Sequence, residues 1–122
     1  MLIDTPTYAG LVQTSSSYLP ARSTFISRHA AHQLVETART AGQLRTDHTT
    51  EGPALADAVT GLLGEHYGAA PATMLVRTSR PDTVARTDVL IVGVDAAVVQ
   101  TAVGAHKLRT TAHSDVVAII AP

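Results

Sequence analysis

The 122-residue chain contains no cysteine and no tryptophan, and aromatic residues make up only 3% of it. The absence of cysteine excludes a disulfide scaffold, a thiolate nucleophile, and zinc or iron–sulfur sites with thiolate ligands. With so few aromatic side chains, the core has to be built from valine, leucine, isoleucine and alanine, which bury less apolar area per residue. We therefore expect a homo-oligomer, in which a second copy of the chain covers part of the apolar surface.

The chain also lacks a surplus of charge of either sign. Nine Lys and Arg side chains nearly balance ten Asp and Glu side chains, for a net charge of -1. The chain has no run of basic residues that could pair with the phosphate groups of a nucleic acid. No apolar run approaches the roughly 20 residues that span a bilayer, and residues 1–10 show no pattern of a secretory signal. We expect a soluble, cytoplasmic protein whose partners are neither nucleic acid nor membrane.

What the sequence does contain is enough apolar material for one core. Hydrophobic residues make up 45% of the chain. A chain of this length and composition is typical of one globular unit, so we predict a single α/β domain over residues 1–122.

The first half of the sequence predicts one strand and two helices. The strand covers residues 8–13 and is followed by a polar loop. A helix then begins at an N-cap formed by Ser23 or Thr24 and ends at Gly42. A second helix begins at Gly52 and Pro53 and ends at Gly68.

The second half predicts short apolar strands over residues 73–77 and 89–94, and a last strand over residues 116–121. The turn-prone cluster at residues 80–82 favours antiparallel pairing of the first two, although parallel pairing stays open. Asp95 is expected to cap a third helix that carries Val98, Val99, Ala102 and Val103. The predicted fold is an α/β or α+β two-layer sandwich of about four strands and three helices, in the order β-α-α-β-β-α-β.

Polar side chains follow three of the predicted strands, and in α/β sheets ligands often bind outside the carboxyl ends of strands. Hydroxyl groups and an arginine suit a carboxylate or a phosphate. No glycine-rich phosphate loop is present, so nucleotide binding has no motif to support it. The alternative is that the serines and threonines only form turns and caps. The predicted ligand-binding residues are Thr14, Ser15, Ser16, Arg80 and Asp95.

The first predicted helix carries His29, His32 and Glu36 at spacing i, i+3, i+7, which places them on one face. Two imidazoles and a carboxylate can hold a divalent metal, for example at a subunit interface. Arg28 and Arg39 share this side, whereas the apolar positions of the helix point the other way. A solvated face is therefore the simpler interpretation, and we predict neither a metal site nor a cofactor.

From Met74 to Pro122 the chain has a predicted strand pair and then an apolar β-α-β segment with Asp95 at the strand–helix junction. This arrangement resembles the second half of bacterial microcompartment shell domains, and residues 9–14 resemble that family's first strand. The resemblance is one of topology. The chain departs from the family because it lacks the glycine-rich pore turn and the usual helix lysine, and because its first and second strands are much further apart. We assign the chain to no family.

Two hypotheses of function follow from the sequence. The first is a non-catalytic module that associates with itself, as a structural protein or a regulatory domain. The second is a small metabolic enzyme that acts on an anionic small molecule at the carboxyl ends of the strands. A cleft lined by His, Arg and Asp would favour chemistry, and flat apolar contacts would favour assembly.

Overall fold

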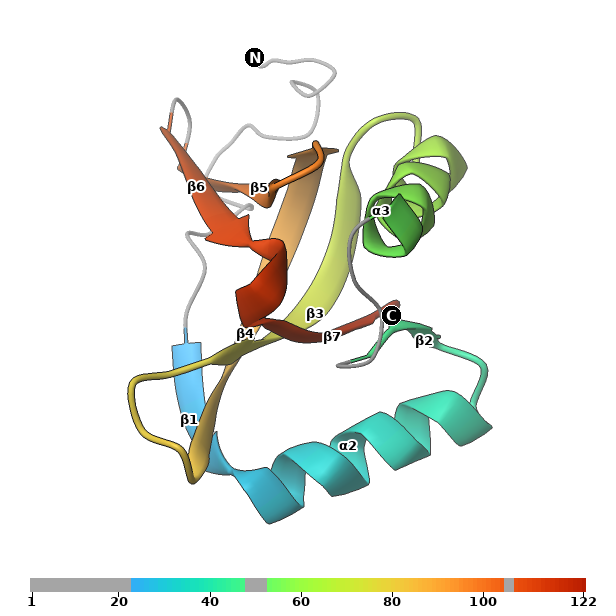
Figure 1. Ribbon diagram of the computed structural model, residues 1–122. Coiled ribbons are helices and arrows are strands. Elements are labelled where there is room, and N and C mark those ends of the chain that lie inside the picture. Colours follow the sequence, from blue (N-terminus) through green and yellow to red (C-terminus); the bar gives the residue numbers. More distant parts are fainter. Residues whose placement is uncertain (1–22, 48–52, 105–106) are drawn as a thin grey trace.

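The computed structural model describes residues 23–47, 53–104 and 107–122 (Figure 1). In this part of the chain, seven strands form one antiparallel sheet and two α-helices pack against it. The predicted fold of about four strands and three helices in two layers is therefore wrong. The predicted strand over residues 8–13 lies outside the described residues.

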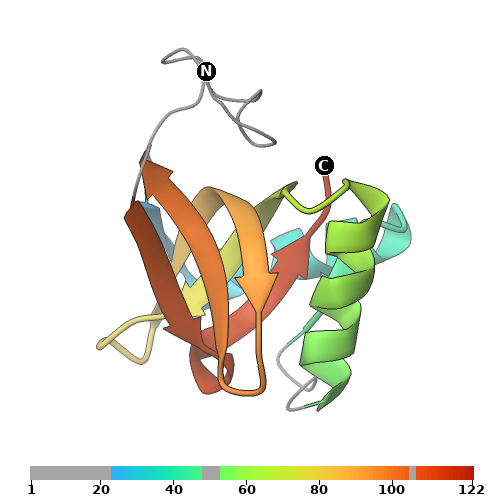
Figure 2. The same cartoon turned by 90° about the horizontal axis from the view of Figure 1, so that it is seen from above.

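Strands β3 to β6 are neighbours in the sheet in the same order as in the chain, whereas β7 and β2 lie on the other side of β3. The strands pair in the order β2-β7-β3-β4-β5-β6, and β1 pairs with the first half of β4, on the same side as β5. Figure 2 shows β5 and β6 running side by side at one margin. The elements are β1 (Ser23–Ser27), α2 (Arg28–Thr40), β2 (Leu44–Thr46), α3 (Pro53–Glu65), β3 (Ala70–Arg77), β4 (Thr83–Val94), β5 (Val98–Gly104), β6 (Lys107–Ala112), the 3-10 turn η2 (His113–Asp115) and β7 (Val116–Ile120).

Helix α2 begins later than the sequence predicts. Residues 23–27 pair with β4 as a strand, and Ser27 is the N-cap, its hydroxyl accepting the backbone N–H of Ala30 at 3.0 Å. The predicted cap at Ser23 or Thr24 is wrong, because several Ser and Thr residues precede the helix and any of them can cap it. The predicted end is confirmed. Gly42 follows the helix with φ +74°, a left-handed conformation that favours glycine.

Helix α3 begins at Pro53, as predicted, since proline fits the first helical position. Its buried residues Leu55, Val59 and Leu62 form an apolar stripe along one side of the helix. The helix ends three residues before Gly68, which has φ +104° and donates its N–H to the carbonyl oxygen of Leu63 at 2.8 Å.

Of the two pairings that the sequence left open around residues 80–82, the structure has the antiparallel one. Strand β3 pairs with β4 from Ala70 opposite Ile91 to Arg77 opposite Val84. The predicted strand over residues 89–94 forms the second half of β4 and lies between β3 and β5.

The predicted third helix is absent, since residues 98–104 form β5, which pairs with β4 and β6. Asp95 caps a hairpin turn instead of a helix. Its Oδ1 accepts the backbone N–H groups of Ala97 at 2.7 Å and Val98 at 2.9 Å. Because residues 98–104 form a strand that pairs with β4 and β6, the predicted β-α-β segment is wrong, and the resemblance to microcompartment shell domains that rested on it is lost.

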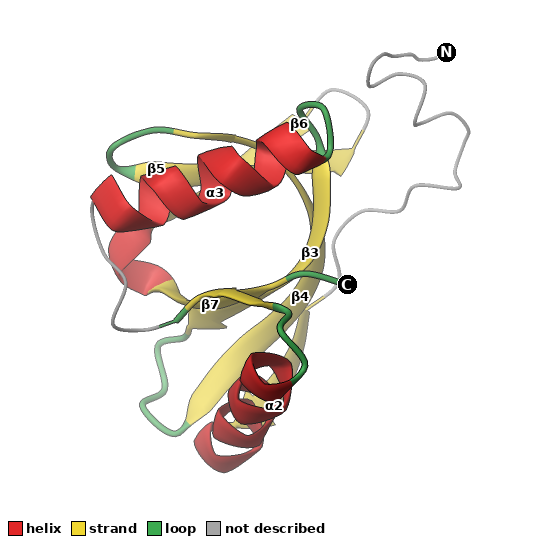
Figure 3. Ribbon diagram, turned by 90° about the vertical axis from the view of Figure 1, so that its right-hand side faces the viewer, coloured by secondary structure: helices red, strands yellow, loops and turns green. Residues whose placement is uncertain are grey.

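The sheet carries one helix on each face, as Figure 3 shows for α2 and α3 on either side of β7. Side chains alternate between the faces of a strand. On β3, Met74 belongs to the core under α3 and Leu75 to the core under α2. On β7, Ile119 and Ile120 divide in the same way. The central strands therefore supply two apolar cores at once.

Helix α3 is too short to span a bilayer, as is α2, so the described residues contain no candidate transmembrane helix.

Candidate anion-binding cleft

A cleft of about 390 Å³ lies between α2 and the turn that joins β3 to β4. One wall is a single face of α2. The other wall is the end of β3, the turn and the start of β4, with Val117 of β7 beside them. The lining residues are Arg28, Ala31, His32, Val35, Glu36, Arg39, Arg77, Thr78, Arg80, Pro81, Thr83, Val84 and Val117.

The charged residues of the cleft are mostly basic. Four arginines, Arg28, Arg39, Arg77 and Arg80, line it together with one carboxylate, Glu36. The whole chain has a net charge of -1. Positive charge is therefore concentrated at this cleft, where a field of one sign attracts an anion.

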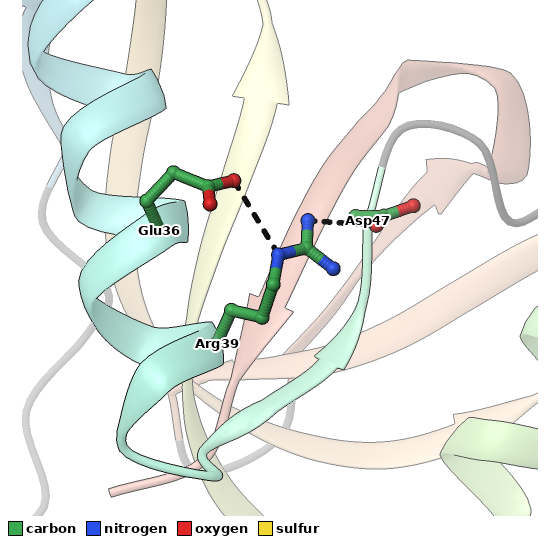
Figure 4. A network of polar contacts seen from close by, with 3 residues as sticks. All are labelled: Glu36, Arg39 and Asp47. Carbon is green, nitrogen blue, oxygen red and sulfur yellow. Dashed lines mark hydrogen bonds and ion pairs between the residues drawn. The ribbon is translucent and has the colours of Figure 1, made fainter.

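At one side of the cleft the guanidinium of Arg39 is paired with two carboxylates in a three-residue network (Figure 4). Arg39 donates from Nε to Glu36 Oε2 at 3.4 Å and from Nη2 to Asp47 Oδ2 at 3.2 Å. The hydrogen bond to Asp47, aided by the nearby charge of Glu36, raises the pKa of Arg39 above its ordinary value. This guanidinium is occupied by the protein's own acids.

The opposite end of the cleft holds guanidinium groups that are not occupied in this way. Neither Arg28 nor Arg80 has a side-chain partner among the described residues, and both side chains are exposed. Their backbones are nevertheless close in space, because the N–H of Arg28 donates to the carbonyl oxygen of Asp82 at 3.1 Å. The first turn of α2 is thus fixed to the turn that carries Arg80.

Arg77 links the cleft to the rest of the sheet. Its Nε donates to the carbonyl oxygen of Ser114 in η2 at 3.0 Å. A guanidinium has five N–H donors, so the remaining four are still available to a ligand.

The turn itself is organised by Thr78. Its Oγ1 accepts the backbone N–H of Arg80 at 3.1 Å and lies 3.0 Å from the carbonyl oxygen of the same residue. It also lies 2.8 Å from the hydroxyl of Thr83, where β4 begins. These bonds hold the backbone that carries Arg80 in one conformation.

Below the charged rim the cleft is apolar. Ala31 and Val35 come from α2, Val84 from β4 and Val117 from β7. The first three are no more than 8% exposed, and all four belong to or pack against the core under α2. The cleft therefore combines cations at its rim with an aliphatic floor.

Arg80 and Asp95, two of the ligand-binding residues predicted from the sequence, lie far apart in the structure. Arg80 lines the cleft, whereas Asp95 follows the other end of β4. Twelve residues of strand, roughly 40 Å of extended chain, separate them. The structure does not bring these two together, because strands that are antiparallel have their carboxyl ends at opposite edges of the sheet. Thr14, Ser15 and Ser16 lie outside the described residues.

Asp95 is occupied by its own turn. The N–H groups of Ala97 and Val98 bond to its carboxylate and lower its pKa below the ordinary value. These bonds give Asp95 a structural role at the β4–β5 turn, and a role in ligand binding stays a prediction.

His29, His32 and Glu36 do not form a metal centre in the structure. Among the described residues no group of three or more His, Asp or Glu side chains is placed to hold a metal ion. All three side chains are exposed, and His32 and Glu36 line the cleft. The face of α2 that carries His32 and Glu36, for which a solvated surface was expected, is therefore one wall of the cleft.

Arg28, Arg39 and Arg77 also line the cleft, and none of them was predicted as a site residue from the sequence. A signal was present for the first two, because Arg28, His32, Glu36 and Arg39 recur at i, i+4, i+8 and i+11 along one side of α2. Such a polar stripe is usual on any surface helix, and only the opposing turn makes it the wall of a cleft.

Comparison of the chain with protein-family models, with curated proteins and with solved structures gives no match. The function has to be argued from the cleft itself.

Proposed function

We propose that the chain binds a small anionic ligand in the cleft between α2 and the β3–β4 turn. The observation that supports the proposal is the pair Arg28 and Arg80, two exposed guanidinium groups at one end of a cleft, without side-chain partners among the described residues. Arginine forms charge-assisted and often bidentate hydrogen bonds with carboxylates and phosphates. The positive end of the α2 dipole lies at the same end of the cleft and favours the same charge.

The proposal keeps one part of the second hypothesis from the sequence, the binding of a small anion at the carboxyl end of a strand. That strand is β3, where Arg77, Thr78 and Arg80 follow one another closely. Asp95 has no part in it. Binding alone accounts for these features, and we attach no catalytic step to the cleft.

Titration of the isotopically labelled protein with acetate and with inorganic phosphate, followed by NMR, tests the proposal. We expect saturable shifts confined to amides of residues 28–39 and 77–84. The double variant Arg28→Gln/Arg80→Gln should lose them. Arg109→Gln removes one charge from exposed β6, outside the cleft, and should keep them. Shifts that spread over the surface, or that Arg109→Gln reduces equally, would show non-specific ion binding and contradict the proposal.

Self-association is a second candidate, supported by two exposed side chains at the margins of the described sheet. Phe25 on β1 is 68% exposed and Leu108 on β6 is 58% exposed. Each of these strands pairs with one other described strand, and unpaired strand edges are common sites of association between chains. The partner would be a second copy of this chain.

Light scattering across a range of protein concentrations tests self-association. We expect a mass above that of one 12.7 kDa chain, and a lower mass for Phe25→Ser or Leu108→Ser. A monomer at every concentration would contradict this candidate and leave the cleft proposal unaffected.

A further inference from the structure

We infer that the ligand of the cleft is an acid with a short aliphatic body, held by its anionic group at the Arg28 and Arg80 end and by its body against the floor. This inference rests on the proposed function and names the class of ligand.

The anionic group has one favourable place. At one end Arg39 is neutralised by Glu36 and Asp47. A second negative group there would meet the carboxylate of Glu36. At the other end the guanidinium groups of Arg28 and Arg80 have no partner among the described side chains. A ligand with one anionic head therefore fits better than a ligand charged at both ends.

The floor indicates what the rest of the ligand is made of. From the first turn of α2 toward Arg39, the cleft runs over Ala31 and Val35, with Val84 and Val117 opposite. Bare phosphate or acetate would leave this surface uncovered. Aliphatic carbon removed from water there is stabilised in proportion to its area.

The lining also disfavours a nucleotide. Among the described residues that line the cleft there is no Phe, Tyr or Trp on which a base would stack. A volume of about 390 Å³ lies in the lower part of the range for small-molecule sites. A compact aliphatic acid matches both features.

The test is a series of straight-chain carboxylates, acetate, butyrate and hexanoate, titrated into the whole protein and followed at the amides of residues 28–39 and 77–84. A fully buried methylene is expected to tighten binding about three- to fourfold, so hexanoate should bind at least about tenfold more tightly than acetate. Inorganic phosphate should bind no better than acetate. Hexylammonium, with the same number of carbon atoms as hexanoate and the opposite charge, should not bind.

A matched pair of variants locates the body of the ligand. Val117→Thr places a hydroxyl on the floor without changing the shape of the side chain, and it should reduce the gain from acetate to hexanoate at least threefold. Val98→Thr makes the same change on β5, outside the cleft, at another half-buried position, and should leave the gain unchanged. Thermal unfolding of both variants verifies that each is folded at the titration temperature.

The outcomes separate the inference from the proposed function. If acetate, butyrate and hexanoate bind equally at the cleft and Arg28→Gln/Arg80→Gln abolishes all three, the cleft is an anion site and the inference of an aliphatic body is overturned. The same holds if Val117→Thr leaves the gain intact, or if hexylammonium binds as well as hexanoate. If no anion shifts the cleft amides, both the inference and the proposed function fail.

Discussion

The hydroxyl groups of Thr78 and Thr83 lie 2.8 Å apart at the base of the β3–β4 turn. Between them the chain reverses, and Arg80 extends from the middle of that reversal. Because Oγ1 of Thr78 also accepts the backbone N–H of Arg80, one hydroxyl determines both the shape of the turn and the position of the arginine.

Replacing Thr78 by valine should therefore affect both stability and binding. We expect Thr78→Val to lower the free energy of unfolding by about 1–2 kcal/mol, since Thr83 and the N–H of Arg80 lose a partner. Hexanoate should bind more weakly as well. Thr78→Ser keeps the hydroxyl and should stay close to wild type. Urea unfolding and the NMR titration measure the two effects, and equal behaviour of the serine and valine variants would disprove the role given to the hydroxyl.

The two glycines Gly42 and Gly61 should respond in opposite directions to the same substitution. A Cβ at either position would meet nothing within 4 Å, so sterics do not distinguish them. Gly42 has φ +74°, and alanine there should cost about 1 kcal/mol. Gly61 lies inside α3, where alanine should stabilise by up to about 1 kcal/mol. Thermal unfolding of the two variants checks this, and a stabilised Gly42→Ala would contradict the expected left-handed strain.

Asp95 should make stability depend on pH in the acidic range. Its pKa is lowered in the folded protein by the N–H groups of Ala97 and Val98, relative to an ordinary value of 3.8. A carboxyl with a depressed folded pKa contributes stability above its unfolded pKa, and this contribution is lost as the pH falls through the folded pKa. Asp95→Asn keeps an oxygen acceptor but not the charge. Its stability deficit should therefore be present at neutral pH and shrink below pH 4.

Carboxyl NMR titration of Asp95 gives its folded pKa directly, and urea unfolding of wild type and Asp95→Asn at several pH values gives the deficit. A titration midpoint at or above the ordinary value, or a deficit that does not change with pH, would contradict the assigned hydrogen bonds.

Two buried threonines form a further matched pair. Oγ1 of Thr101 has no hydrogen-bond partner among the described residues, and this side chain is fully buried. Oγ1 of Thr87 is also in the sheet but lies 2.9 Å from the hydroxyl of Ser23. Thr101→Val removes an unsatisfied polar atom and should stabilise the protein by about 1 kcal/mol, whereas Thr87→Val should destabilise it by about the same amount. If chemical denaturation shows a loss for both, Thr101 has a partner after all.

The parts of the fold that the sequence predicts correctly are those with strong local signals. Pro53 and the stripe of Leu55, Val59 and Leu62 specify α3 without help from the rest of the molecule. Gly42 marks the end of α2 because few other residues adopt a left-handed conformation at low cost.

The errors occur where local signals are ambiguous. Val98, Val99, Ala102 and Val103 fit one side of a helix by spacing, but three of the four are β-branched and favour a strand once β4 offers an edge to pair with. Residues 23–27 are rich in Ser and Thr, which suit both an edge strand and a helix cap. Pairing with β4 decides between them, and that pairing joins residues 56 (Ser27 and Thr83) to 64 (Ser23 and Thr87) positions apart in the sequence.

Prediction of the site from the sequence fails for the same reason, because long-range strand pairing decides which residues meet. Arg80 was predicted because it follows a strand, and it does line a cleft. Its partner in the prediction, Asp95, follows the next strand along the chain and would lie nearby in a parallel sheet. In the antiparallel hairpin it lies at the far edge. Strand direction, which the sequence leaves open, decides which polar residues meet.

The alternation along β3 has a consequence for how this protein can change. Met74 and Leu75 are neighbours in the chain but belong to cores on opposite faces of the sheet. The aliphatic floor of the cleft is part of the core that contains Leu75, and the core under α3 has no member in the cleft lining. The shape of the cleft can accordingly be changed by substitutions on one face of the sheet alone, while the other core continues to hold the sheet together.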